Sequence, residues 1–156
     1  MNNTYYAHTK TSGSKELLVS HLKLTYKYYE KMEKEKKLDI LIKNIIKDTF
    51  NIDNNVTEDI YILFKQAIYY HDIGKINPLF QKNKMNNDLK IETENTDDTH
   101  AALSARIYID SVIEMVMKEK TRLNREELFI KLYSGYFFGY IISRPVSYTH
   151  LTLPTI

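Results

Sequence analysis

The stretch that decides the fold is Tyr69-Tyr70-His71-Asp72-Ile73-Gly74-Lys75. An adjacent His and Asp follow an apolar helical run, so an imidazole nitrogen and a carboxylate can point into one cavity and hold a divalent metal. Gly74 is expected to let the chain turn out of the helix. Lys75 places a cation about one turn from His71, where a phosphate on the metal would need one. Because His-Asp is a common dipeptide, this hypothesis depends on the rest of the chain.

The composition of the chain favours one domain without disulfides. Its 156 residues, of which 43% are hydrophobic, are enough for one domain with a core. A net charge of +2 does not indicate nucleic-acid binding by the whole surface, so such binding would need a local patch. The absence of cysteine leaves His and carboxylates as metal ligands, and it fits a reducing cytosol and a cytoplasmic location. The most apolar run, residues 128–142, is broken by Lys131 and is too short to span a bilayer.

The apolar periodicity predicts an all-α fold with no persuasive strand. Five helices are expected, at residues 15–36, 38–50, 58–71, 99–120 and 125–143. Thr57 is the predicted N-cap of the third helix, and Asp97 or Asp98 is that of the fourth. Asn124 opens the fifth helix with the spacing of a capping box. Residues 1–14 are expected to be irregular.

Three further segments carry expectations about the bundle. The last helix is apolar all round from Leu132 onward, so it is expected in the middle of the bundle. Gly135 and Gly139 would permit a neighbouring helix to approach closely there. Residues 76–81 are expected to form a short helical turn that includes a proline in its first turn. Residues 82–98 are nearly free of apolar side chains and are expected to form a mobile loop that borders the metal cavity.

Three of the five histidines fall on apolar faces of predicted helices, namely His21, His71 and His100. A single histidine in such a position is more often a hydrogen-bonded core residue than a ligand. Three such imidazoles and the Asp72 carboxylate would leave several buried polar groups in need of partners, and a metal would satisfy them together. Spacing alone leaves both interpretations open, hydrogen-bonded core histidines or a metal site.

A resemblance to a known family adds to this pattern. The run His71-Asp72-Ile73-Gly74-Lys75, followed by Asn77-Pro78-Leu79-Phe80-Gln81, is similar to the central motif of the HD-type nucleases of type I CRISPR interference. Three other segments resemble that family's opening, its first metal-binding histidine and a later histidine that opens a helix: Tyr6-Ala7-His8-Thr9, Ser20-His21-Leu22 and Thr99-His100-Ala101-Ala102-Leu103-Ser104-Ala105. In this family the HD domain stands alone or is fused to the CRISPR-associated helicase–nuclease. The Phe80-Gln81 pair distinguishes the group from general HD phosphohydrolases.

The resemblance implies an HD-domain helical bundle with one or two divalent metals at its centre. In that arrangement His21, His71 and Asp72 would hold the first metal, and Asp72 would bridge to a second, partly held by His100. A water activated by the metals would attack a phosphodiester of single-stranded DNA, with Asp72 and Lys75 as catalytic residues. Mixed imidazole and carboxylate ligation suits Mn, Fe, Co or Ni better than Mg or Zn. The implied partners are single-stranded DNA, the CRISPR-associated helicase and the interference complex, with no membrane partner.

The chain departs from the family pattern after the last predicted helix. The family continues with a His-His pair and a late Asp, and neither follows here. Residues 144–156 have no helical period and resemble translated adapter sequence, so they are expected to be a non-native tail that packs little against the bundle. The HD-type domain is accordingly expected at residues 1–143, incomplete at its C-terminal end and doubtful in activity. His8 and His150 are expected to lie outside the set of metal ligands.

Three functions remain open from the sequence. The first is a metal-dependent nuclease that cleaves single-stranded DNA in CRISPR antiviral defence. The second is an HD phosphohydrolase acting on nucleotides or cyclic dinucleotides, against which the Phe80-Gln81 pair argues. The third is a non-catalytic helical domain that binds a partner protein, which the missing distal ligands would allow.

Overall fold

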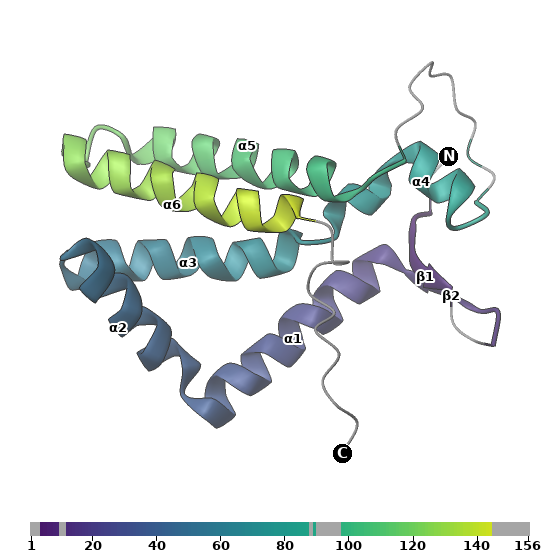
Figure 1. The fold of residues 1–156 in the computed structure, drawn as a ribbon, viewed down its shortest axis with the longest axis horizontal. Coiled ribbons are helices and arrows are strands. Elements are labelled where there is room, and N and C mark those ends of the chain that lie inside the picture. Colours follow the sequence, from purple (N-terminus) through teal and green to yellow (C-terminus); the bar gives the residue numbers. More distant parts are fainter. Residues whose placement is uncertain (1–3, 10–11, 88, 90–97, 145–156) are drawn as a thin grey trace.

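The computed structural model describes residues 4–9, 12–87, 89 and 98–144, and it confirms the all-α fold class (Figure 1). In chain order the elements are β1 (Tyr6–Thr9), β2 (Lys15–Leu17), α1 (Leu18–Lys36), α2 (Leu38–Phe50), α3 (Asn54–Tyr70), the 3₁₀ helix η1 (Ile73–Ile76), α4 (Pro78–Asn83), α5 (Ala101–Glu119) and α6 (Arg125–Ser143). The five predicted helices are all present, and α4 overlaps the predicted helical turn. Most of the predicted loop at 82–98, and the predicted tail from 145 onward, lie outside the described residues.

Helix α3 is the centre of the bundle. Figure 1 shows α5 and α6 side by side along one side of α3, and α1 and α2 forming a V along the other. Ile60 and Leu63 of α3 are fully buried and belong to separate core clusters, one with α2 and one with α5. Burial of each such side chain stabilises the fold by about 1.5–3 kcal/mol. The hairpin, η1 and α4 gather beyond the C-terminal end of α3, where the chain turns into its His-Asp motif (Figure 1).

The N-caps of two helices differ from the prediction. Helix α3 begins at Asn54, one turn earlier than expected, because the side chain of Asp53 accepts a hydrogen bond from the Val56 N–H at 2.9 Å. Thr57 is a buried residue inside the first turn, and its hydroxyl donates to the Asp53 carbonyl at 2.6 Å.

Helix α5 follows His100 without a side-chain cap. Asp98 does not cap it, because its carboxylate pairs with Lys84 at 3.4 Å. Asp97, the alternative cap, lies outside the described residues. The capping box at Asn124 is confirmed, since its side chain accepts from the backbone of Glu127 while the Glu127 side chain accepts from the Asn124 N–H.

The N-terminal segment is a two-stranded antiparallel hairpin, so the predictions of an irregular start and of a helix from residue 15 are wrong. The Leu18 N–H continues the strand pairing by donating to the Tyr5 carbonyl at 2.9 Å. The hairpin is also held from outside its own sequence, because the backbone of Tyr6 bonds to the Gln81 side chain on α4. Ala7 of β1 is fully buried. These partners lie far apart in the sequence, and periodicity within a short segment carries no information about them.

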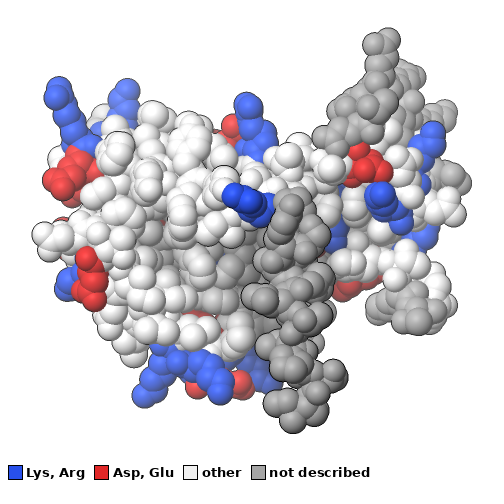
Figure 2. Space-filling model, viewed as in Figure 1, with Lys and Arg blue, Asp and Glu red and all other residues white. Residues whose placement is uncertain are grey.

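The prediction that α6 lies in the middle of the bundle is also wrong. Its outer face carries six large side chains that are at least half exposed, namely Phe129, Tyr133, Tyr136, Phe137, Tyr140 and Ile141. Figure 2 shows few charged side chains over the part of this view where α3, α5 and α6 lie. An apolar composition on all sides of a helix does not itself provide neighbours for every side. Within the described residues, α6 packs its inner face mainly against α5 and α3.

The inner face of α6 approaches α5 closely, as its glycines predict. A Cβ atom at Gly135 would lie 2.4 Å from Cγ1 of Val112 on α5, and one at Gly139 would lie 2.6 Å from Cγ1 of Ile109. Both distances are far below van der Waals contact, so the spacing of the two helices depends on these positions being glycine.

We therefore expect Gly135→Ala to destabilise the protein although alanine favours a helix. Overpacking against Val112 should lower the free energy of unfolding by about 1–2 kcal/mol, as measured by urea denaturation. In a Val112→Ala background, which makes room for the added methyl group, the same change should be neutral or stabilising. A gain in stability from Gly135→Ala in the unmodified protein would contradict the close packing.

Candidate metal centre

The carboxylate of Asp72 is the centre of the candidate site. It is buried at the turn between α3 and η1. Its Oδ2 atom lies 3.1 Å from Nε2 of His21, 3.4 Å from Nε2 of His71 and 2.8 Å from Nζ of Lys75. The other oxygen, Oδ1, lies 3.3 Å from Nε2 of His100. The structure thus brings together the five residues that the sequence proposed for the site.

Four elements deliver these side chains. His21 comes from the first turn of α1, His71 directly follows α3, and His100 directly precedes α5. Lys75 lies in η1, whose tight turn begins with a hydrogen bond from the Lys75 N–H to the Asp72 carbonyl at 3.0 Å. The site is therefore assembled where helices begin and end, and its geometry depends on how those ends are packed.

Gly74 has a different role from the one expected. It lies inside η1, and it is not among the described residues with a left-handed backbone. Its importance is the close approach of η1 to α5, since a Cβ at Gly74 would lie 2.0 Å from the carbonyl oxygen of His100. The Gly74 N–H also donates to the buried hydroxyl of Ser104 at 2.8 Å. Gly74 therefore sets the distance between the loop that carries Asp72 and the helix end that carries His100.

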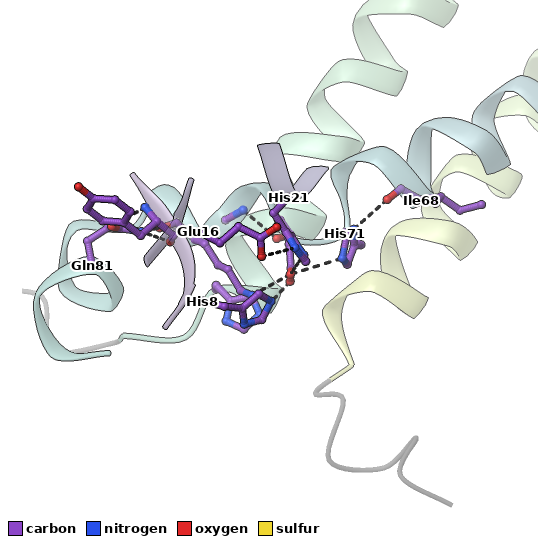
Figure 3. A network of polar contacts seen from close by, with 12 residues as sticks. His8, Glu16, His21, Ile68, His71 and Gln81 are labelled. Carbon is purple, nitrogen blue, oxygen red and sulfur yellow. Dashed lines mark hydrogen bonds and ion pairs between the residues drawn. The ribbon is translucent and has the colours of Figure 1, made fainter. Parts of the chain in front are cut away.

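The hydrogen bonding of His71 assigns its tautomer. Its Nδ1 atom lies 2.8 Å from the carbonyl oxygen of Ile68, which can only accept, so Nδ1 carries the proton (Figure 3). In the neutral ring Nε2 then presents a lone pair toward the Asp72 carboxylate. Two acceptors facing each other at 3.4 Å need a proton or a cation between them. A carbonyl that orients an imidazole in this way is typical of histidine ligands of metals.

His21 lies between two carboxylates. Its Nδ1 is 3.4 Å from the Glu16 carboxylate, and its Nε2 is 3.1 Å from that of Asp72 (Figure 3). A proton on Nδ1 toward Glu16 leaves Nε2 as a donor of its lone pair toward the centre, the arrangement of a carboxylate–histidine–metal triad. Glu16 is thus a supporting residue that the sequence did not indicate.

His8, which was expected to lie outside the set of metal ligands, lies beside the candidate site. Strand β1, which the sequence did not predict, carries it to the hairpin edge, where its ring lies 4.7 Å from that of His21 in an edge-to-face contact (Figure 3). Its Nε2 is 3.3 Å from Nζ of Lys75. The only sequence signal was the place of His8 in a segment resembling the family's opening, with no helical face to direct it inward.

A divalent ion fits this donor set. One ligand atom from each of His8, His21 and Asp72 lies within 4.8 Å of the others. Nitrogen and oxygen ligands bind first-row divalent metals at about 2.0–2.2 Å, so small side-chain movements would bring all three into contact with one ion. Among the described residues, His8, His21 and Asp72 thus form a group of three side chains that could hold one metal ion.

The electrostatics of the centre favour positive charge beside Asp72. Burial alone would raise the pKa of Asp72, but its contacts with His100, His71 and Lys75 hold that pKa well below the usual range. Burial likewise opposes charge on His71, yet the contact with Asp72 raises the pKa of His71 above its ordinary value. Partial burial, followed by the charges of Lys75 and His21, lowers the pKa of His8, which keeps its ring in the neutral form that binds metals.

Comparison with known proteins does not assign the chain to a family. No protein-family model, curated protein or solved structure matches the chain. Within the described residues, no helix combines the length and apolar character needed to cross a membrane. The arrangement defines a helical protein with a candidate metal centre of imidazoles around one carboxylate.

Gly74→Ala should disturb this centre through the backbone. The added methyl group would meet the His100 carbonyl, so η1 and the start of α5 must separate. We expect a lower melting temperature and binding of Ni²⁺ weakened by about tenfold or more, measured by isothermal titration calorimetry.

Ser104→Ala is the matched control, because it removes the hydrogen bond to Gly74 without adding a clash. It should cost stability while changing Ni²⁺ affinity much less. Unchanged Ni²⁺ affinity in Gly74→Ala would show that the spacing between Asp72 and His100 has no part in binding.

Proposed function

We propose that this chain is an HD-type metal-dependent phosphodiesterase, and specifically a nuclease that cleaves single-stranded DNA in CRISPR antiviral defence. The observation that carries the proposal is the buried Asp72 carboxylate with imidazole nitrogens on both of its oxygens. Each of these contacts needs a proton or a cation between nitrogen and carboxylate, and a bound divalent ion would fill that place for several imidazoles at once. Along the chain, His21, His71-Asp72 and His100 follow one another in the order of the HD-type motifs described above.

Asp72 has the geometry of a bridging ligand in this proposal. Its Oδ2 faces His21 and His71, and its Oδ1 faces His100, so the two oxygens lie beside different imidazoles. This division supports the expectation of one or two metal ions. Bound ions of this kind stabilise the charge of a phosphodiester and lower the pKa of a water near it. The mixed nitrogen and oxygen donors favour Mn, Fe, Co or Ni over Mg.

Lys75 lies inside the centre, so in this proposal its positive charge would act on a phosphate bound at the metals and not on one at the protein surface. Its side chain is 5% exposed, and its ammonium contacts the Asp72 carboxylate. Its proposed role is to share the charge of a bound phosphate with the metals from within the site. Local positive charge for a DNA backbone would come from exposed lysines such as Lys23 and Lys27 on α1.

A second candidate function, a partner-binding helical domain, is favoured by one observation. The outer face of α6 presents aromatic side chains over its whole length, with Phe129 67% exposed. Exposed apolar faces of this extent mark interaction sites in many soluble proteins. Partner binding by this face is also compatible with the proposed nuclease, which would act with a CRISPR-associated helicase and the interference complex. A non-catalytic domain would keep the partner binding without the hydrolysis.

Asp72→Ala and Lys75→Ala should separate metal binding from phosphate binding. Asp72→Ala should remove bound metal and abolish cleavage of single-stranded DNA in Mn²⁺ or Ni²⁺, because the centre loses its carboxylate. Lys75→Ala should retain metal and weaken substrate binding. The measurements are elemental analysis and a cleavage assay on single-stranded DNA beside a panel of nucleotides and cyclic dinucleotides.

Asp110→Ala, which removes an exposed carboxylate on α5, is the control and should change neither result. Full metal content and activity in Asp72→Ala would overturn the mechanism. Hydrolysis of nucleotides without cleavage of DNA would assign the general HD phosphohydrolase function instead. Metal binding without hydrolysis of any substrate would favour the partner-binding function.

A further inference from the structure

The side chain of Gln81 uses its full hydrogen-bonding capacity in the interior of the protein. It is completely buried on α4. Its Nε2 donates to the carbonyl oxygens of Tyr6 and Lys75, each at 2.7 Å. Its Oε1 accepts from the Tyr6 N–H at 3.0 Å and from Nδ2 of Asn87 at 2.9 Å. An amide side chain with two donors and two acceptor positions has no further bonds to make.

These bonds join the two segments that carry the metal centre. Tyr6 precedes His8 by two residues on β1, and Lys75 follows Asp72 by three residues in η1. The paired bonds to the Tyr6 N–H and carbonyl resemble those of a neighbouring strand, so the side-chain amide of Gln81 takes the place of a strand residue beside β1. One amide thus fixes the distance between the strand of His8 and the loop of Asp72 (Figure 3).

The hairpin depends on this attachment for its position. A two-stranded hairpin is marginally stable in water, and β2 is only three residues long. The register is irregular between Tyr6 and His8, and such an irregularity redirects the side chains that follow it. Another polar tie between the hairpin and the rest of the protein, from Lys15 to the Asn86 carbonyl, is exposed. Burial of Ala7 adds an apolar attachment, and the buried Gln81 amide supplies the directional bonds that can hold the strand of His8 in a defined orientation.

We propose that Gln81 is a positioning residue that delivers His8 to the metal centre, and that His8 is a metal ligand beside His21 and Asp72. The inference rests on the proposed metal-dependent function and adds a ligand and its support to it. The Phe80-Gln81 pair, so far only a sequence feature, thereby acquires a physical role. Gln81 acts through His8 and does not itself contact the ion.

A double-mutant cycle tests this proposal on Ni²⁺ affinity, measured by isothermal titration calorimetry on the whole chain. Gln81→Met keeps the size of the side chain and removes all four hydrogen bonds. It should weaken Ni²⁺ binding by about tenfold to a hundredfold, as should His8→Ala. In the His8→Ala background, Gln81→Met should produce less than about a twofold further loss, because the ligand it positions is gone.

Tyr29→Phe is the matched control for lost stability. It removes a buried hydrogen bond of 2.9 Å between Tyr29 and Tyr61, away from the centre. It should lower the melting temperature and leave Ni²⁺ affinity unchanged. If Gln81→Met does not fold, Gln81→Asn takes its place in the cycle, since it keeps a neutral amide on a side chain too short to bond to Tyr6 and Lys75 together.

Each alternative result has one meaning. Equal losses from the Gln81 variant with and without His8 would make Gln81 a purely structural residue and overturn the proposal. Unchanged affinity in His8→Ala would remove His8 from the ligands and overturn it too, while leaving the proposed metal centre intact. Absence of Ni²⁺ binding by the unmodified protein, equal to that of Asp72→Ala, would overturn the proposed function and this inference together.

Discussion

Burial of the Asp72 carboxylate is the constraint on which the rest of the site depends. An ionised carboxylate removed from water costs several kcal/mol unless opposite charge and hydrogen bonds surround it. Here α1, η1, the residue after α3 and the residue before α5 each contribute a group that faces it. None of these groups could stay in place if its element shifted by a turn. The need to satisfy one anion therefore ties together the ends of helices whose middle parts pack in separate apolar clusters.

The apolar core and the polar centre are consecutive parts of the same helix. Along α3, Ile60 and Leu63 enter core clusters with α2 and with α5, and the helix then ends in His71. The carbonyl of Ile68, in the last turn of α3, orients the ring of His71. Packing along the helix thus fixes where the imidazole stands, and a backbone group near the helix end fixes which nitrogen it presents. A change in the core at the middle of α3 would be transmitted to the centre through this helix end.

Prediction from the sequence succeeded where the information is local and failed where it is distant. Helical periodicity located the five main helices and placed His21, His71 and His100 on inward faces, because those patterns repeat within a few residues. The hairpin, and with it His8, depends on bonds from Tyr6 to Gln81 across 75 positions of sequence, and no local pattern records them. The face of α6 was misjudged for a related reason. Composition states that a face is apolar but not whether a neighbour covers it.

The position of Lys75 shows how such a centre can be stable with or without an ion. Its ammonium lies 2.8 Å from Asp72 and 3.3 Å from the neutral ring of His8, within the space that the metal-ligating atoms share. The charge that makes Asp72 a strong ligand therefore also holds the lysine, and a divalent ion must share the carboxylate with it or displace it. The Lys75 carbonyl is in turn held by Gln81. The backbone of Lys75 thus stays fixed while its flexible side chain can move, so the charge can shift toward a phosphate without loss of the loop that carries Asp72.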